Sequence, residues 1–574
     1  MMRAASRGLL RRRASSCAEA STVGGWALSE AGRAAARSPE THAVVNQART
    51  DGDWNAFAGE ATLTEGLALA GGGKHAPLLE AYGAEVGAAT WRAVAAAANR
   101  NVPTLETHDA FGRRVGRAAY DDGYHRLLAL ALERGAAGLA WQRDAGPGAH
   151  AARATALYLT YQLDPGVACP ATMTFASRPV LATWTSPAAD LWLPKVEARA
   201  YDGRDVPVED KRAATIGMSM TEKQGGSDVR ANSTVAERVN DEEYVLTGHK
   251  WFTSAPNSDA FLTLARTAEG PTCFLVPRRL PGGDANAGFR PLRLKAKLGD
   301  HSNASSEVEY ANAWGLLVGE PGRGVRAILD MVHHTRLDCA VGSAALMRQC
   351  ARHAALHCAG RVAFGRPLLE QPLMRAVVAD LAVETEAANG AWQRVARAFD
   401  AGEDDFARLA TPLAKYWLCK RAPAVAAEAM ECLGGNGYVE AHGAARRYRQ
   451  APLNSIWEGS GNVIALDLLR ALRRHPAARA AFLGELARAR GADARLDGAL
   501  DALPAALDAV DERGARSLAD RLAVAFQAAT LVRHGDGAIA EAYCATRLAS
   551  TGVNFGARLC PPAAEARAID RLLL

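Results

Sequence analysis

The sequence has no long hydrophobic run. Nowhere in its 574 residues do 18 apolar residues follow one another without interruption, although 49 % of the chain is hydrophobic. A membrane-spanning helix needs about 20 predominantly apolar residues, so no such helix is expected. With 22 % charged residues, the composition instead predicts a soluble globular protein.

The ten cysteines also lack any paired spacing. They are scattered between Cys17 and Cys560, and none forms a C-x-x-C pair. This excludes the common zinc signatures and favours free thiols in a reducing compartment. His353 and His357 have the spacing of a helical metal pair, but no third ligand with a plausible spacing accompanies them. We therefore expect no metal site.

Outside its first 40 residues the sequence has almost no net charge. The formal net charge is +5, and residues 1–40 contribute +4 of it through seven Arg against three Glu. The near-neutral remainder argues against nucleic acid as the main partner. From Ala471 to Leu574 there are 14 Arg, 12 acidic residues and no Lys, which indicates a solvated helical surface.

The first 18 residues contain no acidic residue, and their Arg alternates with Ala, Ser and Leu. This composition is typical of an organelle transit peptide, and we expect a protein of the mitochondrial matrix. A chloroplast address and a plain basic tail remain alternatives. The last four residues, R-L-L-L, are not a peroxisomal S-K-L address.

A chain of this length is expected to divide into three or four domains. Apolar residues at three- and four-residue spacing predict helices from about residue 53 to residue 196. Short β-rich segments separated by turn residues then predict a small antiparallel barrel or sandwich. Helical patterns that follow are long enough for a four-helix bundle. The predicted divisions are 1–40 (transit peptide or disordered), 41–213 (N-terminal helical domain), 214–324 (middle β domain), 325–474 (four-helix bundle) and 475–574 (helical extension).

Individual elements can be predicted from the same patterns. The predicted strands are 244–246, 251–254, 261–265, 273–276 and 306–310. The predicted bundle helices are 325–336, 337–362, 372–399, 408–433 and 463–472.

The stretch N-S-I-W-E-G-S-G-N at residues 454–462 contains one carboxylate, Glu458. The preceding Ile-Trp pair reduces its solvation, which raises the pKa of a carboxyl group and strengthens it as a base. The following glycines let a flat ligand approach closely. A Glu before a helix is also commonly only a favourable contact with the helix dipole, so the stretch alone leaves both interpretations open.

Two further motifs suit a nucleotide cofactor. In M-T-E-K-Q-G-G-S-D at 220–228, the Gly pair followed by Ser and Asp offers N–H groups and hydroxyls to a pyrophosphate, although a hairpin turn has the same composition. In H-K-W-F-T-S at 249–254, Trp251 can stack on a planar ring and Thr253 can hydrogen-bond to its edge. A buried core Trp is the commoner explanation for a lone aromatic residue in a strand.

Two motifs of the bundle are equally ambiguous alone. Arg361 in R-V-A-F-G-R-P closes a predicted helix, where it can bind a phosphate bidentately or simply cap the helix. L-G-G-N-G-Y at 433–438 contains part of a dinucleotide-binding fingerprint. It follows a helix and not a strand, which excludes a Rossmann motif.

Taken together, these motifs resemble the acyl-CoA dehydrogenase family. M-T-E-K-Q-G-G-S-D, H-K-W-F-T-S, R-x-x-F-G-x-P, L-G-G-N-G-Y and W-E-G-S-G-N occur in that order and spacing, and the resemblance covers about residues 41 to 474. The variants are most similar to the AidB branch, the bacterial alkylation-response flavoproteins. T-H and V-N-Q at 41–47, C-P and M-T-F at 169–175, and the helical extension also suit that branch.

The resemblance implies a mainly α fold with an N-terminal helical domain, a middle β domain and a C-terminal four-helix bundle, assembled as a homotetramer. It implies FAD between the β domain and the bundle, and an acyl-CoA substrate. The cofactor-binding residues it implies are Met220, Thr221 and Ser227 (flavin and pyrophosphate), Trp251 and Thr253 (flavin ring), Arg361, Phe364, Gly434 and Gly435 (from a neighbouring subunit), and Ser460 and Asn462 (beside the base).

Glu458 falls on the family's catalytic base. Some members place the base on the earlier bundle helix, immediately before an Arg, but here Thr335 precedes Arg336 and cannot act as a base. The implied reaction removes the proton α to a thioester carbonyl while a hydride leaves the β carbon for the flavin. Electrons then pass to an electron-transfer flavoprotein or to oxygen.

Two other functions fit the same FAD constellation. One is a protective or DNA-associated flavoprotein with little dehydrogenase turnover, as proposed for the AidB branch; the near-neutral chain and its Lys-free extension argue against DNA. The other is an acyl-CoA oxidase, which the absent peroxisomal address weakens. The sequence does not identify the acyl chain.

Overall fold

The computed structural model describes residues 29–36, 41–48, 52–550 and 552–574. The chain forms two units, Met1–Gln47 and Ala48–Leu574, which are described separately. In the first unit the helix α2 spans Glu30–Ala36. The predicted transit peptide falls largely within residues 1–28, outside the described residues, and stays a prediction. No helix in the described ranges is long and apolar enough to cross a membrane.

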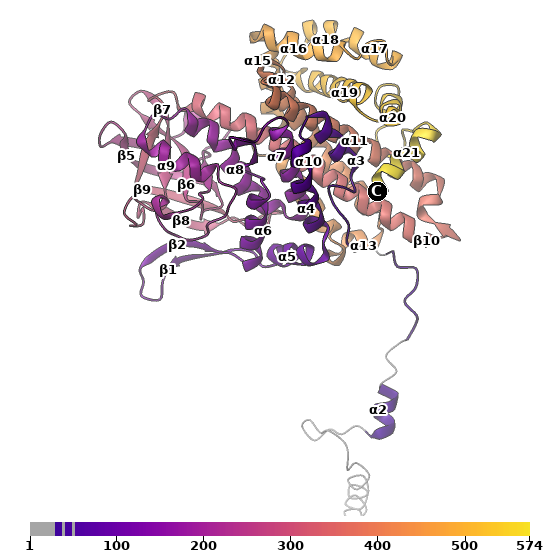
Figure 1. Ribbon diagram of the computed structural model, residues 1–574, viewed down its shortest axis with the longest axis horizontal. Helices are drawn as coiled ribbons and strands as arrows, with labels where there is room; N and C mark the ends of the chain where they lie inside the picture. Colours follow the sequence, from indigo (N-terminus) through magenta and orange to yellow (C-terminus); the bar gives the residue numbers. More distant parts are fainter. Residues whose placement is uncertain (1–28, 37–40, 49–51, 551) are drawn as a thin grey trace, which may run out of the picture. The chain divides into compact units, whose positions relative to one another are not determined.

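The second unit begins with a helical layer built around two buried helices, α7 and α8. Its helices are α3 (Ala61–Leu69), α4 (Ala76–Gly87), α5 (Ala89–Arg100), α6 (Asp122–Glu133), α7 (Ala149–Leu163), α8 (Pro165–Ala182) and α9 (Pro187–Val196). Asp164 begins α8 by accepting the N–H of Gly166 at 2.9 Å, and Pro165 stands at the first helical position, where its missing N–H is not needed. Helix α8 contacts both the sheet and the bundle (Figure 1).

A β-hairpin interrupts this layer, where the sequence pattern predicted only helices. Strands β1 (Thr104–His108) and β2 (Arg114–Ala119) pair in antiparallel fashion. In the turn, Asp109 Oδ1 accepts the N–H groups of Phe111 and Arg113, and Gly112 adopts a left-handed φ of 77°. The helical prediction for this stretch was therefore wrong, because the turn chemistry and the β-branched residues outweigh the weak helical spacing.

The middle of the chain forms one seven-stranded sheet that closes into a barrel. Its strands are β3 (Ile216–Ser219), β4 (Val235–Arg238), β5 (Glu243–Ser254), β6 (Ala260–Thr267), β7 (Gly270–Pro277), β8 (Phe289–Leu294) and β9 (Ser305–Val318). The pairing path β6-β4-β5-β9-β7 returns to β6, while β3 pairs with β6 and β8 pairs with β9. A barrel is one of the two predicted alternatives, but it is not wholly antiparallel as predicted, because β3 and β4 pair with β6 in parallel.

Strand β5 combines two segments that were predicted as separate strands. Its register against β9 shifts twice, between Leu246 and Thr247 and between Lys250 and Thr253. Gly248 lies between these shifts, and a Cβ there would come within 2.7 Å of the Thr234 backbone. The turn-like residues in the middle of β5 therefore serve a close backbone approach and do not end the strand.

The bundle follows the barrel. Its long helices are α10 (Gly324–Gly360), α11 (Pro372–Ala401), α12 (Asp404–Cys432) and α15 (Gly461–Arg474); α13 (Gly435–Tyr438) and α14 (Ala444–Gln450) are shorter. The break predicted after residue 336 does not exist, because α10 runs through it for 37 residues. A short hairpin, β10 (Val362–Ala363) with β11 (Arg366–Pro367), joins α10 to α11. Asp338 of α10 binds Arg153 of α7 in a fully buried ion pair.

The C-terminal extension is helical, as predicted, and packs on the bundle. Its helices are α16 (Pro476–Ala487), α17 (Ala494–Asp501), α18 (Leu503–Ala509), α19 (Ala515–His534), α20 (Gly537–Arg547) and α21 (Pro562–Leu573). Helix α19 contacts α11, α12 and α15, and α21 contacts α10 and α11. The extension therefore belongs to the same compact unit as the bundle (Figure 1).

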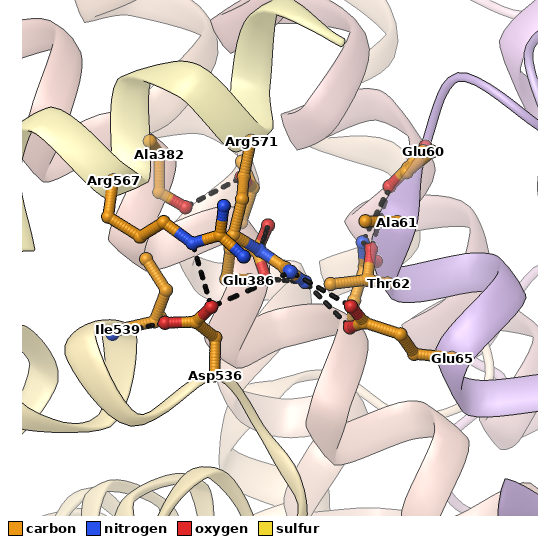
Figure 2. Close-up of polar contacts among 12 residues, drawn as sticks. Glu60, Ala61, Thr62, Glu65, Ala382, Glu386, Asp536, Ile539, Arg567 and Arg571 are labelled. Carbon is orange, nitrogen blue, oxygen red and sulfur yellow. Dashed lines mark hydrogen bonds and ion pairs between the residues drawn. The ribbon is translucent and has the colours of Figure 1, made fainter.

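Arg571 of α21 connects the last helix of the second unit to the first helix of that unit, α3. Its guanidinium binds Glu65 of α3 at 2.7 and 2.9 Å and Glu386 of α11 at 3.1 Å. Figure 2 shows Arg571 between these two acids, with Asp536 beside them, which binds Arg567 at 2.8 Å and lies 3.9 Å from Arg571. The side chains of Arg571 and Glu386 are 2 % and 6 % exposed, so this ion pair is almost completely removed from water.

Replacing Arg571 with Met is expected to lower the free energy of unfolding by about 3–5 kcal/mol, since it leaves a buried carboxylate without its partner. The matched control is Arg567→Gln, which removes the half-exposed partner of Asp536 and should cost about 0–1 kcal/mol. Urea unfolding of both variants measures the difference. Equal losses in the two variants would contradict this account of the C-terminal contact.

Candidate active site

Glu458 lies where the helical layer, the barrel and the bundle meet. Its neighbour Trp457 packs against Cys169 and Met173 of α8 and against Ala255 at the end of β5. Glu458 itself adopts a left-handed φ of 56°, a conformation that costs free energy in a residue with a Cβ. Strain of this kind persists only where surrounding contacts hold the backbone in place.

Those contacts come from α10 and α12. Thr335 Oγ1 donates a hydrogen bond to Glu458 Oε2 at 2.6 Å, and Arg336 Nε donates to the Glu458 carbonyl at 3.2 Å. Lys415 of α12 donates to the carbonyl of Gly459. Arg336 is itself bound to Asp467 of α15 at 2.7 Å, so the segment is held from both sides.

Burial raises the pKa of Glu458. Desolvation of the carboxyl group is the largest effect, and the hydrogen bond from Thr335 and the charges of Arg336 and Lys415 partly oppose it. The protonated form is therefore favoured more than in water, while one donor still stabilises the carboxylate. A carboxyl with a raised pKa is the stronger base when it is ionised.

The barrel contributes the loop that contains Met220, Thr221 and Ser227. A buried pair holds this loop: Lys250 Nζ donates to Glu222 Oε1 at 2.9 Å, and both side chains are fully buried. The Glu222 charge is thereby neutralised inside the barrel and does not repel a pyrophosphate at the loop. Met220 and Thr221 are half-buried and Ser227 is exposed.

Trp251 lies beside this loop. The backbone N–H of Trp251 donates to the Thr221 carbonyl at 2.8 Å, and Lys295 Nζ lies 3.1 Å from the centroid of the half-buried indole ring. Thr253, two residues further along β5, is fully buried, with its Oγ1 2.6 Å from Ser219 Oγ. Trp251 therefore lies near the loop with a cation over one face of its ring. The Thr253 hydroxyl makes its hydrogen bond inside the barrel.

Ser460 and Asn462 follow Glu458 directly. Ser460 is the residue before α15, Asn462 lies in the first turn of that helix, and both are exposed. The two side chains therefore stand on the surface beside the base, in a position to contact a bound molecule.

The remaining predicted cofactor residues lie elsewhere. Arg361 follows the last residue of α10 and is 26 positions from Thr335, which corresponds to about 39 Å along an α-helix. Gly434 and Gly435 follow α12, whose last residue Cys432 hydrogen-bonds to Cys358 near the same end of α10. One chain therefore does not bring these residues to Glu458.

Phe364 is the most exposed residue of that distant group. It stands at the tip of the β10–β11 hairpin with a left-handed φ of 53°, and 98 % of its surface is exposed. An aromatic side chain in this position makes no use of its apolar surface within the described chain. Of the histidine pair at 353 and 357, His353 lies against Arg447 of α14.

Sequence reasoning missed several groups of this site. The sequence shows only that Thr335 cannot act as a base, yet in the fold its hydroxyl is the hydrogen-bond donor to Glu458. Lys415 and Asp467 lie in helices without a recognisable motif, so no sequence signal marked them. Lys250 and Glu222 do stand in motifs, but their pairing depends on the barrel closing.

The residues present at the barrel and at Glu458 fit a flavin nucleotide. A Gly-rich loop with an exposed Ser227 suits a pyrophosphate, and the half-buried indole of Trp251 suits a planar ring. The loop's one buried carboxylate is neutralised by Lys250. These residues would hold one part of the cofactor.

Comparison with known proteins defines the class. Residues 217–313 match the acyl-CoA dehydrogenase middle domain and residues 322–473 the acyl-CoA dehydrogenase C-terminal domain. The chain therefore belongs to the acyl-CoA dehydrogenase family, whose cofactor is FAD. Residues 46–203 match the N-terminal domain of the adaptive response protein AidB, which places the chain in the AidB-like branch.

Individual relatives agree. AidB of Escherichia coli (strain K12) is 41 % identical over 517 residues, which cover 89 % of this chain and 95 % of the relative. Acyl-CoA dehydrogenase family member 11 of Caenorhabditis elegans is 32 % identical over 388 residues, 64 % of this chain and 62 % of the relative. The structure of C. elegans ACDH-11 in complex with C11-CoA matches with a TM-score of 0.79 and 26 % identity, over 92 % of this chain and 98 % of that one. The predicted family and fold class are confirmed.

Replacing Thr335 with Val keeps the shape of the side chain and removes the donor to Glu458. A hydrogen bond to a charged group is worth about 1.5–3 kcal/mol, so its loss destabilises the carboxylate and raises the pKa of Glu458 further. The carboxyl should then stay protonated to higher pH. Infrared titration of the protonated carboxyl band, assigned by its absence in Glu458→Gln, measures this change.

Thr335→Ser is the control, because it retains the hydroxyl and should titrate like the parent protein. A Thr335→Val variant that titrates at the same pH as the parent would show that the hydrogen bond does not stabilise the carboxylate.

Proposed function

We propose that the protein catalyses the FAD-dependent α,β-dehydrogenation of an acyl-CoA thioester, with Glu458 as the base. The observation that carries this proposal is the half-buried Glu458 side chain, whose carboxyl group is desolvated and bound by Thr335. A base that removes a weakly acidic proton α to a carbonyl works best when its pKa lies near the working pH, and burial moves Glu458 in that direction.

The two carboxylate oxygens have different tasks in this proposal. Oε2 accepts the hydrogen bond of Thr335, and among the described residues no hydrogen bond reaches Oε1. Oε1 is therefore the oxygen that receives the α proton, while the Thr335 bond keeps the carboxyl group oriented. Bound FAD supplies the acceptor for the hydride that leaves the β carbon.

The cofactor site is completed by a second copy of the chain. Arg361 lies about 39 Å along α10 from Thr335, which contacts the base, and this distance is too long for both ends to bind one ligand in the same chain. Phe364, Gly434 and Gly435 lie near the Arg361 end. Phe364 is 98 % exposed and Tyr438, at the same end of the bundle, is 81 % exposed. An apolar surface of this kind marks an interface, which supports the homotetramer that the family resemblance implies.

An acyl-CoA is the substrate that the relatives support. The C. elegans relative was crystallised in complex with C11-CoA, a thioester of the expected class. An electron-transfer flavoprotein is the proposed electron acceptor, and the mitochondrial matrix is the proposed location.

A DNA-associated function is supported less well. Eight of the 14 Arg residues after residue 470 form ion pairs with carboxylates of the chain. More than half of the positive charge of this region is thus neutralised internally. Phosphate backbones are bound mainly by unpaired Lys and Arg, so the dehydrogenase function is favoured.

The FAD-loaded protein should be reduced by an acyl-CoA under anaerobic conditions, seen as bleaching of the flavin absorbance. A panel of straight and branched acyl-CoAs of increasing length identifies the chain that reacts fastest. Glu458→Gln should lose the reaction by at least 100-fold while retaining FAD and acyl-CoA binding, since a positioned base contributes about 10²–10⁴-fold.

Bleaching by one acyl-CoA that Glu458→Gln abolishes would support the dehydrogenase. A fully FAD-loaded protein that no acyl-CoA bleaches would contradict it and leave the protective function. The control is Glu440→Gln, which changes an exposed carboxylate paired with Arg449 and should bleach like the parent protein.

A further inference from the structure

A pocket away from Glu458 lies where the C-terminal extension meets the bundle and the first helical layer. Its volume is about 370 Å³, within the range of small-molecule sites. None of the residues that contact Glu458 lines it. Its polar walls come from α11 (Arg394, Arg397), from α16 and the residue that follows it (Glu485, Arg488), and from the end of α19 (Arg533, His534).

The Glu485 carboxylate accepts hydrogen bonds from three of the four arginines of the pocket. Glu485 accepts from Arg394 Nε at 2.7 Å, from Arg533 at 2.7 Å and from Arg488 at 3.0 Å. Burial alone would raise the pKa of Glu485, but these three guanidinium groups outweigh it and lower the pKa. The carboxylate is therefore ionised, and all three of its hydrogen bonds come from arginines other than Arg397.

The other two acids of the pocket are also engaged. Asp400 accepts the backbone N–H groups of His150 and Ala151 at 2.7 and 3.0 Å, and Glu403 binds Arg394 at 2.6 Å. Neither acid is paired with Arg397. The pocket thus holds four arginines against three acids.

Arg397 is the one arginine of the pocket that pairs with none of these three acids. In the described chain it forms no hydrogen bond or ion pair, and its Nε is buried without a partner. Burial, with the neighbouring Arg394, lowers the pKa of Arg397 to about 10, so the group is still charged at neutral pH. A half-buried charge without a partner is costly, and an anion beside it would remove that cost.

His534 does not offset this excess of positive charge. Burial, followed by the charges of Arg397 and Arg533, lowers its pKa to about 4, so the imidazole is neutral at physiological pH. A neutral imidazole can accept or donate a hydrogen bond and supplies no negative charge to Arg397.

We propose that this pocket binds a phosphate-bearing anion and that Arg397 is its principal ligand. The planar guanidinium matches two phosphate oxygens at once, which a chloride or a point cation does not reproduce. The small volume of this open pocket, which α11, α16 and α19 border, favours a free phosphate or the phosphate of a small nucleotide over a nucleic acid duplex. Bound there, the anion joins the extension to the bundle.

The test uses the FAD-loaded, full-length protein and isothermal titration calorimetry with inorganic phosphate and with AMP, at constant ionic strength set by sodium chloride. Saturable binding of at least one of the two is expected. Arg397→Gln should weaken it by about tenfold or more, because a charge-assisted hydrogen bond is worth about 1.5–3 kcal/mol. Arg397→Lys should restore it only in part.

Arg490→Gln is the matched control, because Arg490 is an exposed arginine of the extension that pairs with Asp501 outside the pocket. It should bind like the parent. Arg397→Gln should fold normally, since it loses no partner, and its melting temperature should equal or exceed that of the parent protein.

Binding of phosphate but not AMP would identify free phosphate as the ligand, and tighter binding of AMP would identify a nucleotide. Binding that Arg397→Gln leaves unchanged would overturn the proposal. The proposal would also be overturned if neither phosphate nor AMP bound. This holds even if a short DNA duplex bound in a manner that depends on Arg397, since the ligand would then be a nucleic acid and not a small anion.

Discussion

The uninterrupted helix α10 is the constraint on which the rest of the structure depends. Its 37 residues span about 55 Å, with Thr335 near one end and Arg361 just beyond the other. The helix is held by α7 through the buried pair of Arg153 with Asp338 and packs against α11 and α12. Because it is rigid, it separates the base from four of the eleven expected cofactor residues by a distance that no loop movement closes.

The general fold could be predicted from the sequence because long periodic patterns and Gly-rich turns are local signals. The order of helices, barrel and bundle follows from them, and so does the extension. Strands β3, β4 and β8, of four to six residues, were not predicted, and the β1–β2 hairpin was predicted as helix. Such short elements depend on their pairing partners more than on their own pattern.

In the site, too, features set by neighbouring residues could be predicted from the sequence, whereas contacts between distant residues could not. Glu458 could be found because its apolar and glycine neighbours adjoin it in the sequence. Its donor Thr335 is 123 residues away, and the pair Glu222 with Lys250 forms only when the barrel closes. Each residue was visible alone, but a contact between distant residues is not encoded in any single stretch.

The most direct test of the account is whether two defective chains repair one another. Glu458→Gln and Arg361→Ala subunits, carrying different affinity tags, would be co-expressed and their mixed oligomers isolated and loaded with FAD. Glu458 and Arg361 lie at opposite ends of α10, so a site formed between two subunits takes one residue from each. A mixed pair should therefore contain one site with both residues intact and regain flavin bleaching by acyl-CoA, whereas each variant alone should be inactive. Mixed oligomers no more active than the separate variants would show that each chain completes its own site and would contradict the account.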